Sequence, residues 1–158
     1  MVLRLTILFL RMTTHYTTLP LMELLLLLVA CYGQKALMAK LDIKHAFHLC
    51  TVHLEDRELL GIHWQGKFFI DLCLPFGLRS SPYLFNHLAD SFEWFLKNNY
   101  RIQDLMRYLD DYFTVGPAHS SICAHNVKTI LHMASQVGIP LAPNKLEGPP
   151  HAWCFWVS

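Results

Sequence analysis

The stretch Leu105-Met106-Arg107-Tyr108-Leu109-Asp110-Asp111-Tyr112-Phe113-Thr114-Val115 sets two adjacent carboxylates between two apolar or aromatic runs. The runs from Leu105 to Leu109 and from Tyr112 to Val115 have the length and residue types of strands, and the acidic pair favours a turn between them. Two negative charges placed against apolar strands are costly unless a cation compensates them. Magnesium is the obvious candidate, because it prefers hard oxygen ligands. We therefore predict a hairpin with an acidic, cation-binding turn.

A third carboxylate, Asp42, follows another short apolar run. We predict a buried strand from Ala36 to Ile43, with Asp42 at its end beside the acidic hairpin. Three carboxylates from two segments can hold two metal ions ~4 Å apart, the arrangement that supports in-line phosphoryl displacement. An Asp-Asp pair alone is weak evidence, since turns favour Asp for local hydrogen bonding. The interpretation therefore depends on the surrounding sequence.

The rest of the chain alternates helical and strand patterns. A hairpin is predicted from Leu59 to Trp64 and from Lys67 to Leu72, and a helix from about Ser121 to Val137. Thr17-Thr18 before Leu19-Pro20 predicts a helix start, with Gly33 as its stop. Another helix begins at Ser80-Ser81-Pro82, and apolar residues recur in it at helical spacing: Leu84, Phe85, Leu88, Phe92, Phe95 and Leu96. This order predicts an α+β domain, an antiparallel sheet with helices on one face.

Composition limits the classes of function only weakly. The 158 residues are 53% apolar, enough for the core of one domain or of a piece of a larger one. A net charge of +1 gives no electrostatic argument for nucleic acid and does not exclude it. The five dispersed cysteines argue against a disulfide framework. The segment from His151 to Cys154 has zinc-ligand spacing, but no second pair completes a tetrahedral site.

The N-terminal region contains two apolar runs, residues 1–10 and 19–31. Neither reaches the ~20 apolar residues of a membrane span, so a buried helix is favoured over a membrane or secreted protein for the second run. We expect residues 1–17 to be an extension outside the fold and no membrane partner. The chain is expected inside the cell, in the cytoplasm or the nucleus.

Four segments resemble the motifs of reverse transcriptases, in the family's order. Tyr108-Leu109-Asp110-Asp111 resembles the YxDD signature, motif C, and the segment from Leu41 to Phe47 resembles motif A. Leu74-Pro75-Phe76-Gly77-Leu78-Arg79-Ser80-Ser81-Pro82 resembles motif B, and Gly138 to Lys145 resembles motif D. The amino-acid sequences of motif B and of residues 140–149 are most similar to those of DIRS-type retrotransposons, which integrate by a tyrosine recombinase. The next most similar are those of gypsy-like elements.

The resemblance implies an RNA-directed DNA polymerase. Residues 18–158 would form the polymerase palm and part of the fingers, acting on a primed RNA or DNA template with dNTP; no protein partner is implied. The metal ligands for two Mg²⁺ ions, or for Mn²⁺, would be Asp42, Asp110 and Asp111. Lys145 would protonate pyrophosphate, a task that suits a lysine whose pKa is drawn towards working pH.

The resemblance also implies a nucleotide site. Backbone amides near the triphosphate would come from Ile43, Lys44, His45 and Ala46. Phe47 falls at the steric-gate position, where an aromatic ring excludes a ribose 2′-hydroxyl; a core phenylalanine is the alternative. Phe76 and Gly77 would lie under the nascent base pair. The primer and template contacts would be Tyr108, Leu109 and Arg79, although a solvated arginine is an equal alternative for the last.

The pattern also departs from the family. Basic fingers motifs are not found upstream of Asp42, and Phe155 falls at motif E without the expected glycine. The thumb and an RNase H domain are missing. We therefore expect a truncated retrotransposon fragment. The alternative is a catalytically inactive palm remnant that at most binds nucleic acid.

Overall fold

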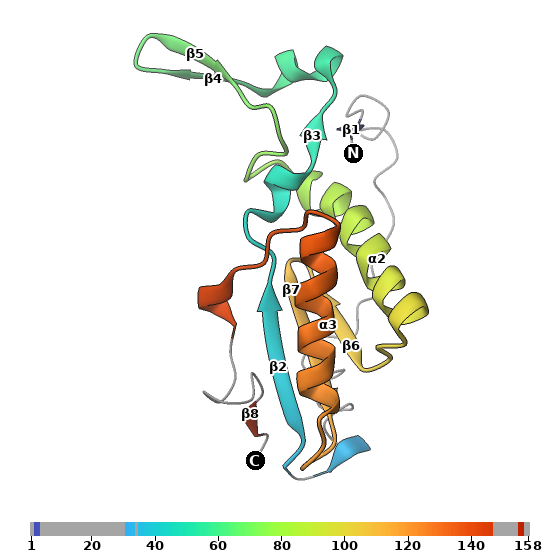
Figure 1. Ribbon diagram of the computed structural model, residues 1–158. Coiled ribbons are helices and arrows are strands. Elements are labelled where there is room, and N and C mark those ends of the chain that lie inside the picture. Colours follow the sequence, from blue (N-terminus) through green and yellow to red (C-terminus); the bar gives the residue numbers. More distant parts are fainter. Residues whose placement is uncertain (1, 4–30, 34, 147–154, 157–158) are drawn as a thin grey trace. The chain divides into compact units, whose positions relative to one another are not determined.

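The computed structural model describes residues 2–3, 31–33, 35–146 and 155–156 (Figure 1). The chain divides into two compact units, one with Met1–Tyr16 and His45–Leu88, the other with Thr17–Lys44 and Ala89–Ser158. Nearly all of the predicted N-terminal helix, and the segment from His151 to Cys154, lie outside the described residues. Among the described residues, no helix combines the length and the apolar character that a membrane crossing requires.

The second unit is built on a four-stranded antiparallel sheet. Its strands, in spatial order, are β6 (Leu105–Tyr108), β7 (Asp111–Gly116), β2 (Leu37–Asp42) and β8 (Phe155–Trp156). Tyr108 pairs with Asp111, so Leu109 and Asp110 form a two-residue turn. The predicted hairpin and the strand before Asp42 are confirmed, with β7 beginning at Asp111 rather than at Tyr112.

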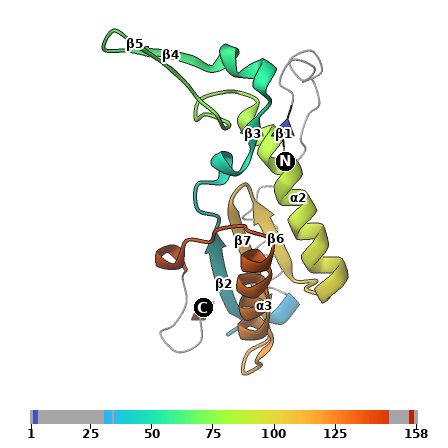
Figure 2. The same cartoon turned by 45° about the horizontal axis from the view of Figure 1, so that its top comes forward.

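The two faces of this sheet differ, because side chains alternate along a strand. One face is apolar and fully buried, with Ala39, Leu41 and Tyr112 at most 1% exposed. Helix α3 (Ile122–Gln136) packs on β7 and β2 (Figures 1 and 2). The amide of Asn126 in α3 donates a hydrogen bond of 2.9 Å to the hydroxyl of Thr114 in β7. The predicted α+β layering is therefore confirmed, and the opposite face is left to carry Asp42.

The second helix, α2 (Ser81–Tyr100), contacts the same face of the sheet through its C-terminal half. The phenol of Tyr112 donates a hydrogen bond of 3.0 Å to the carbonyl of Ala89, and its ring meets the edge of Phe92 with centroids 5.7 Å apart. The predicted apolar stripe is largely right: Leu84, Phe85, Phe92 and Leu96 are buried, while Leu88 and Phe95 are partly exposed. Burial of the aromatic rings fixes the helix against the strand that carries Asp111.

Arg107 joins the acidic turn to α2. Its side chain is 9% exposed, forms an ion pair with Asp90, and places Nε 3.4 Å from Oε2 of Glu93. Its Nη1 also donates a hydrogen bond of 3.1 Å to the carbonyl of Leu109, which has a left-handed φ of 52°. One guanidinium thus holds both the helix and the turn that carries Asp110.

The first unit is mostly irregular, with short strands and 3-10 helices. It contains β1 (Val2–Leu3) paired parallel with β3 (Thr51–Val52), the 3-10 helices η1 (Ala46–Leu49) and η2 (Leu54–Leu60), and the hairpin of β4 (Gly61–Trp64) and β5 (Lys67–Ile70). Gln65 and Gly66 have φ of 49° and 73°, as a type I′ hairpin turn requires. The predicted strand start at Leu59 is wrong by two residues, and the predicted end at Leu72 is also two residues too long. The first error arises because η2, with Glu55 and Asp56 in its first turn, extends to Leu60.

We expect Arg107→Met to lower the free energy of unfolding by about 2 kcal/mol, because it removes the largely buried arginine from its ion pairs with Glu93 and the more exposed Asp90. Urea unfolding of the full chain followed by circular dichroism measures the change. The matched control is Lys128→Met, an exposed position on α3 where less than about 0.5 kcal/mol is expected. Equal effects of the two substitutions would contradict the assigned role of Arg107.

Candidate active site

The three predicted metal-ligand aspartates come together at one end of the sheet. Asp42, the last residue of β2, pairs directly with Asp111, the first residue of β7. Directly opposed residues share one face of a sheet, so both carboxylates lie on the side away from Leu41 and Tyr112. The backbone amide of Ile43 donates a hydrogen bond of 2.9 Å to the carbonyl of Asp110. The register of two strands, rather than proximity in sequence, gathers these residues.

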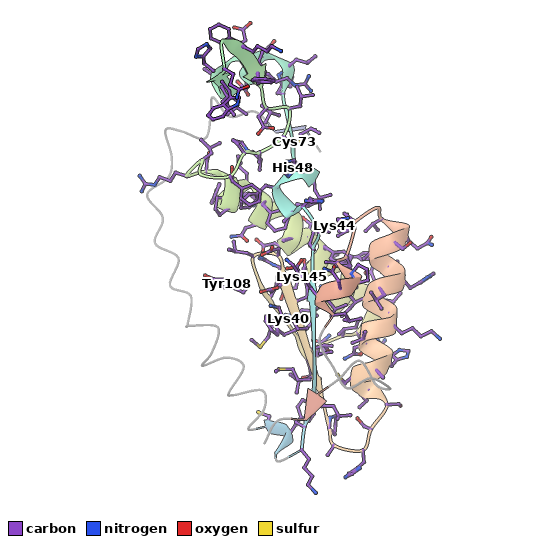
Figure 3. All side chains as sticks on the ribbon, turned by 90° about the vertical axis from the view of Figure 1, so that its left-hand side faces the viewer. Lys40, Lys44, His48, Cys73, Tyr108 and Lys145 are labelled. Atoms are coloured by element: carbon purple, nitrogen blue, oxygen red, sulfur yellow. The ribbon has the colours of Figure 1, made fainter. Side chains whose placement is uncertain are left out.

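Two lysines offset the negative charge. The Nζ atom of Lys145 lies 2.9 Å from Oδ2 of Asp42, and Nζ of Lys40 lies 3.1 Å from Oδ2 of Asp111. Figure 3 labels Lys40 and Lys145, and both lie beside β2. Like charges placed directly opposite each other destabilise a sheet. Each carboxylate of the opposed pair is therefore compensated by its own ammonium group.

Lys145 reaches Asp42 because the chain after α3 runs along the end of β2. The amide of Lys44 donates a hydrogen bond of 2.8 Å to the carbonyl of Pro140. The amide of Ala142 donates one of 2.9 Å to the carbonyl of Asp42. The short 3-10 helix η3 (Pro143–Lys145) follows at once and ends on the lysine. The motif D segment is thus held by backbone hydrogen bonds to the motif A strand.

The pKa of Asp110 is raised, first by burial and further by the nearby charges of Asp42 and Asp111; its own backbone and Lys145 act in the opposite direction. The pKa of Lys145 is also raised, mainly by its hydrogen bond to Asp42 and then by the charge of that carboxylate. The condition that the pKa of Lys145 be drawn towards working pH is therefore not met. Its ion pair with Asp42 keeps the ammonium protonated.

The donor atoms suit a hard divalent cation. Asp111 Oδ1 is buried and has no hydrogen-bond partner in the described part of the chain, which is costly for a carboxylate oxygen. Asp42 is 6% exposed, and its carboxylate faces the same side of the sheet. Within the described ranges, no group of three or more His, Cys, Asp or Glu side chains is arranged to hold a metal ion as it stands. The oxygen chemistry fits Mg²⁺, while the carboxylates make ion pairs with lysines.

Two of the four backbone amides predicted to bind the triphosphate already donate hydrogen bonds within the chain. The Ile43 and Lys44 amides donate to Asp110 and Pro140 as described above, so they hold the site together. These two amides are engaged in backbone hydrogen bonds, and a role for them at the triphosphate stays a prediction. His45 and Ala46 are left as candidates; His45 has a left-handed φ of 54° and directly precedes η1.

The first unit gathers the aromatic residues of motifs A and B. The Phe47 ring lies with its centroid 5.8 Å from that of buried Phe85 and 5.1 Å from that of Phe76, which is 75% exposed. Gly77 follows at φ 85°, a conformation that any other residue would adopt with strain. The hydroxyl of Ser81 donates a hydrogen bond of 2.7 Å to the carbonyl of Pro75 and so closes this loop. Phe47 thus packs at the edge of a core and is also partly open to solvent.

The remaining predicted contacts are exposed, except for Leu109, which is half-buried. Arg79 lies on the surface of the motif B loop. Tyr108 ends β6 with 52% of its surface exposed, and Leu109 follows in the turn. Both are open to a partner, and neither contacts the carboxylates by a hydrogen bond that the structure records in its described residues.

Sequence reasoning missed Lys40 and Arg107. Lys40 could have been found, because it lies two residues before Asp42 on a predicted strand and hence on the same face. Nothing in the sequence marks Arg107, whose role comes from contacts with a helix that lies before it in the chain. The signal for Lys40 was thus present in the local sequence, whereas the role of Arg107 depends on tertiary packing.

Comparisons with known proteins show which family has this architecture. A family model described as reverse transcriptase (RNA-dependent DNA polymerase) matches residues 7–151. A search of curated protein sequences finds no match. The foamy viral protease-reverse transcriptase in complex with an RNA/DNA hybrid has a TM-score of 0.59 at 20% identity, covering 69% of this chain and 14% of that chain. The dRH form in complex with double-stranded DNA has a TM-score of 0.59 at 17% identity, covering 78% and 21%.

The selenomethionine-labelled prototype foamy virus protease-reverse transcriptase CSH mutant is similar with a TM-score of 0.58 at 22% identity, covering 72% of this chain and 14% of that one. At such identities the likeness shows the fold, an antiparallel sheet with helices like that of a reverse transcriptase palm. The chain spans between 14% and 21% of the length of these enzymes. The family model covers most of the sequence, and the chain therefore belongs to the reverse transcriptase family of RNA-dependent DNA polymerases.

Proposed function

We propose that this chain is a polymerase palm with part of the fingers, residues 18–158, that carries out template-directed DNA synthesis. The reaction is two-metal nucleotidyl transfer from a dNTP to the 3′-hydroxyl of a primer on an RNA or DNA template. The observation that carries the proposal is the direct pairing of Asp42 with Asp111, with Asp110 in the adjoining turn. Family membership supports RNA-directed DNA polymerase function in general.

Asp42 and Asp110 are the proposed main ligands of two Mg²⁺ ions, or of Mn²⁺, with Asp111 as a weaker ligand through its unpartnered Oδ1. Two such ions would activate the 3′-hydroxyl and neutralise the leaving pyrophosphate. The chain itself supplies the fixed geometry. Ile43 ties the Asp110 turn to the Asp42 strand, so ligands from two segments keep one relative position.

Phe47 is the proposed steric gate. A ring held by Phe85 and Phe76 cannot easily move aside, and selection by a clash costs a deoxynucleotide nothing. Phe76 and Gly77 would lie under the nascent base pair, and the amides of His45 and Ala46 would meet the triphosphate. Tyr108 and Leu109 would face the primer end, and Arg79 a template phosphate.

Lys145 is the proposed partner of the leaving pyrophosphate. Because Asp42 raises its pKa, Lys145 is a weak proton donor and a persistent cation. Its contribution would therefore be mainly electrostatic, offsetting charge that develops on the leaving group. The exposed side chain has room to turn from Asp42 to a phosphate.

The proposed source is a retrotransposon of the tyrosine-recombinase type. The support is the amino-acid sequence of two segments, from Leu74 to Pro82 and from Pro140 to Pro149. Gypsy-like elements are the nearest alternative. The assignment changes neither the chemistry nor the proposed roles of the residues.

Asp110→Asn is expected to lower primer extension on poly(rA)/oligo(dT) with Mg²⁺ by about 10²–10³-fold, since a metal-ligand charge contributes several kcal/mol to the transition state. The exposed Glu58→Gln makes the same chemical change outside the site and is expected to leave the rate unchanged. Synthesis that survives Asp110→Asn would overturn the site assignment. Primer-template binding without any synthesis by the unmodified chain would instead support an inactive remnant.

Phe47→Ala is expected to raise incorporation of ribonucleotides relative to deoxynucleotides by on the order of 10–100-fold, because the added space removes the clash with the 2′-hydroxyl. Single-nucleotide extension with dTTP and UTP measures the ratio. Phe68→Ala, at a ring that is 83% exposed on the β4–β5 hairpin, is the matched control. An unchanged ratio would leave Phe47 as a core residue only.

A further inference from the structure

Lys40 is held more firmly than the other lysine of the site. It lies on β2 on the same face as Asp42, and its Nζ is 3.1 Å from Oδ2 of Asp111. The same Nζ lies 5.8 Å from the ring centroid of Phe113, its register partner on β7. Its side chain is 27% exposed, against 58% for Lys145. A strand position, a carboxylate and an aromatic face together fix this ammonium group.

The two oxygens of Asp111 are therefore unequal. Oδ2 is engaged by Lys40, while Oδ1 is buried and has no hydrogen-bond partner among the described residues. Three carboxylates and two ammonium groups share this end of the sheet. Lys145 can leave through solvent, whereas releasing Lys40 requires breaking both the ion pair and the ring contact. Lys40 is thus the ammonium group that stays beside Asp111.

We propose that Lys40 is a positioning residue that withholds Oδ2 of Asp111 from the metal. It assigns cation binding to Asp42, Asp110 and the single free oxygen of Asp111, and so keeps the affinity for divalent cations moderate. The inference rests on the proposed function of the site. It goes further in naming the group that makes Asp111 the weaker ligand, a role that the sequence motif does not explain.

Removal of Lys40 has two opposed consequences. Asp111 loses a contact that orients it, which would weaken cation binding. It also gains a second unpaired oxygen, whose negative charge is no longer neutralised by an ammonium group and is available to the ion. Divalent-cation affinity rises with the number and the charge of the available oxygen ligands. Electrostatic interactions between partly buried charges are also stronger than the stabilisation that one orienting contact gives. We expect the second consequence to dominate.

The test measures Mn²⁺ binding to the full chain by electron paramagnetic resonance of the free ion, at neutral pH and without nucleic acid. Lys40→Met is expected to bind Mn²⁺ at least tenfold more tightly, and Lys40→Arg to bind as the unmodified chain does. In the Asp111→Asn background, the gain from Lys40→Met should fall to less than threefold. A gain that persists there would show that Lys40 repels the ion directly, and would overturn the proposal.

An unchanged or weaker affinity of Lys40→Met would also overturn it, as would absence of Mn²⁺ binding by every variant. Because Lys40→Met leaves carboxylates uncompensated, thermal unfolding with and without Mn²⁺ is a second measurement. The ion should raise the melting temperature of Lys40→Met more than that of Lys40→Arg. Lys40→Gln serves the same comparison if Lys40→Met does not fold. Failure of the proposed function would appear separately, as Mn²⁺ binding without primer extension.

Discussion

The pairing of β2 with β7 places Asp42 directly opposite Asp111, and the candidate site depends on this register. A slip of one residue would move every side chain of one strand to the other face. The buried face prevents that slip, because Leu41 pairs with Tyr112 and both are removed from solvent. Burial of these two apolar side chains stabilises the register by more than the repulsion between the two opposed carboxylates destabilises it. That repulsion costs about 1 kcal/mol at most. Packing on the apolar face thus determines which charged residues lie opposite each other on the other face.

The charges are then compensated from two directions. Lys40 comes from the same strand as Asp42, and Lys145 comes from a segment 103 residues farther along the chain. Their geometry separates their roles, because one is fixed between a carboxylate and a ring and the other is open to solvent. A site built this way pairs two of its carboxylates with ammonium groups beside a core, and it leaves one of these ammonium groups able to change partners.

The acidic turn is held in a conformation that its residues do not favour. Leu109 has a φ of 52° at a position where glycine is the usual residue of a two-residue hairpin turn. Such backbone strain costs on the order of 1–3 kcal/mol and persists only where the surroundings fix the conformation. Here the surroundings are Arg107 on the carbonyl of Leu109, and Ile43 on the carbonyl of Asp110. Both contacts also position the carboxylate of the turn.

The amino-acid sequence alone determined what depends on local pattern: the α3 and α2 helices, the β4–β5 hairpin, the acidic turn, and the family to which Asp42, Asp110 and Asp111 point. Residues such as Phe47 were also identifiable, because a motif fixes their spacing from Asp42. Only the tertiary structure decided the ion pairs of Lys40 and Lys145, and the use of the Ile43 and Lys44 amides by strand-edge pairing. The physical reason is that register and edge contacts join segments about 70 to 100 residues apart, and no local periodicity encodes which partner a charge or an amide will meet.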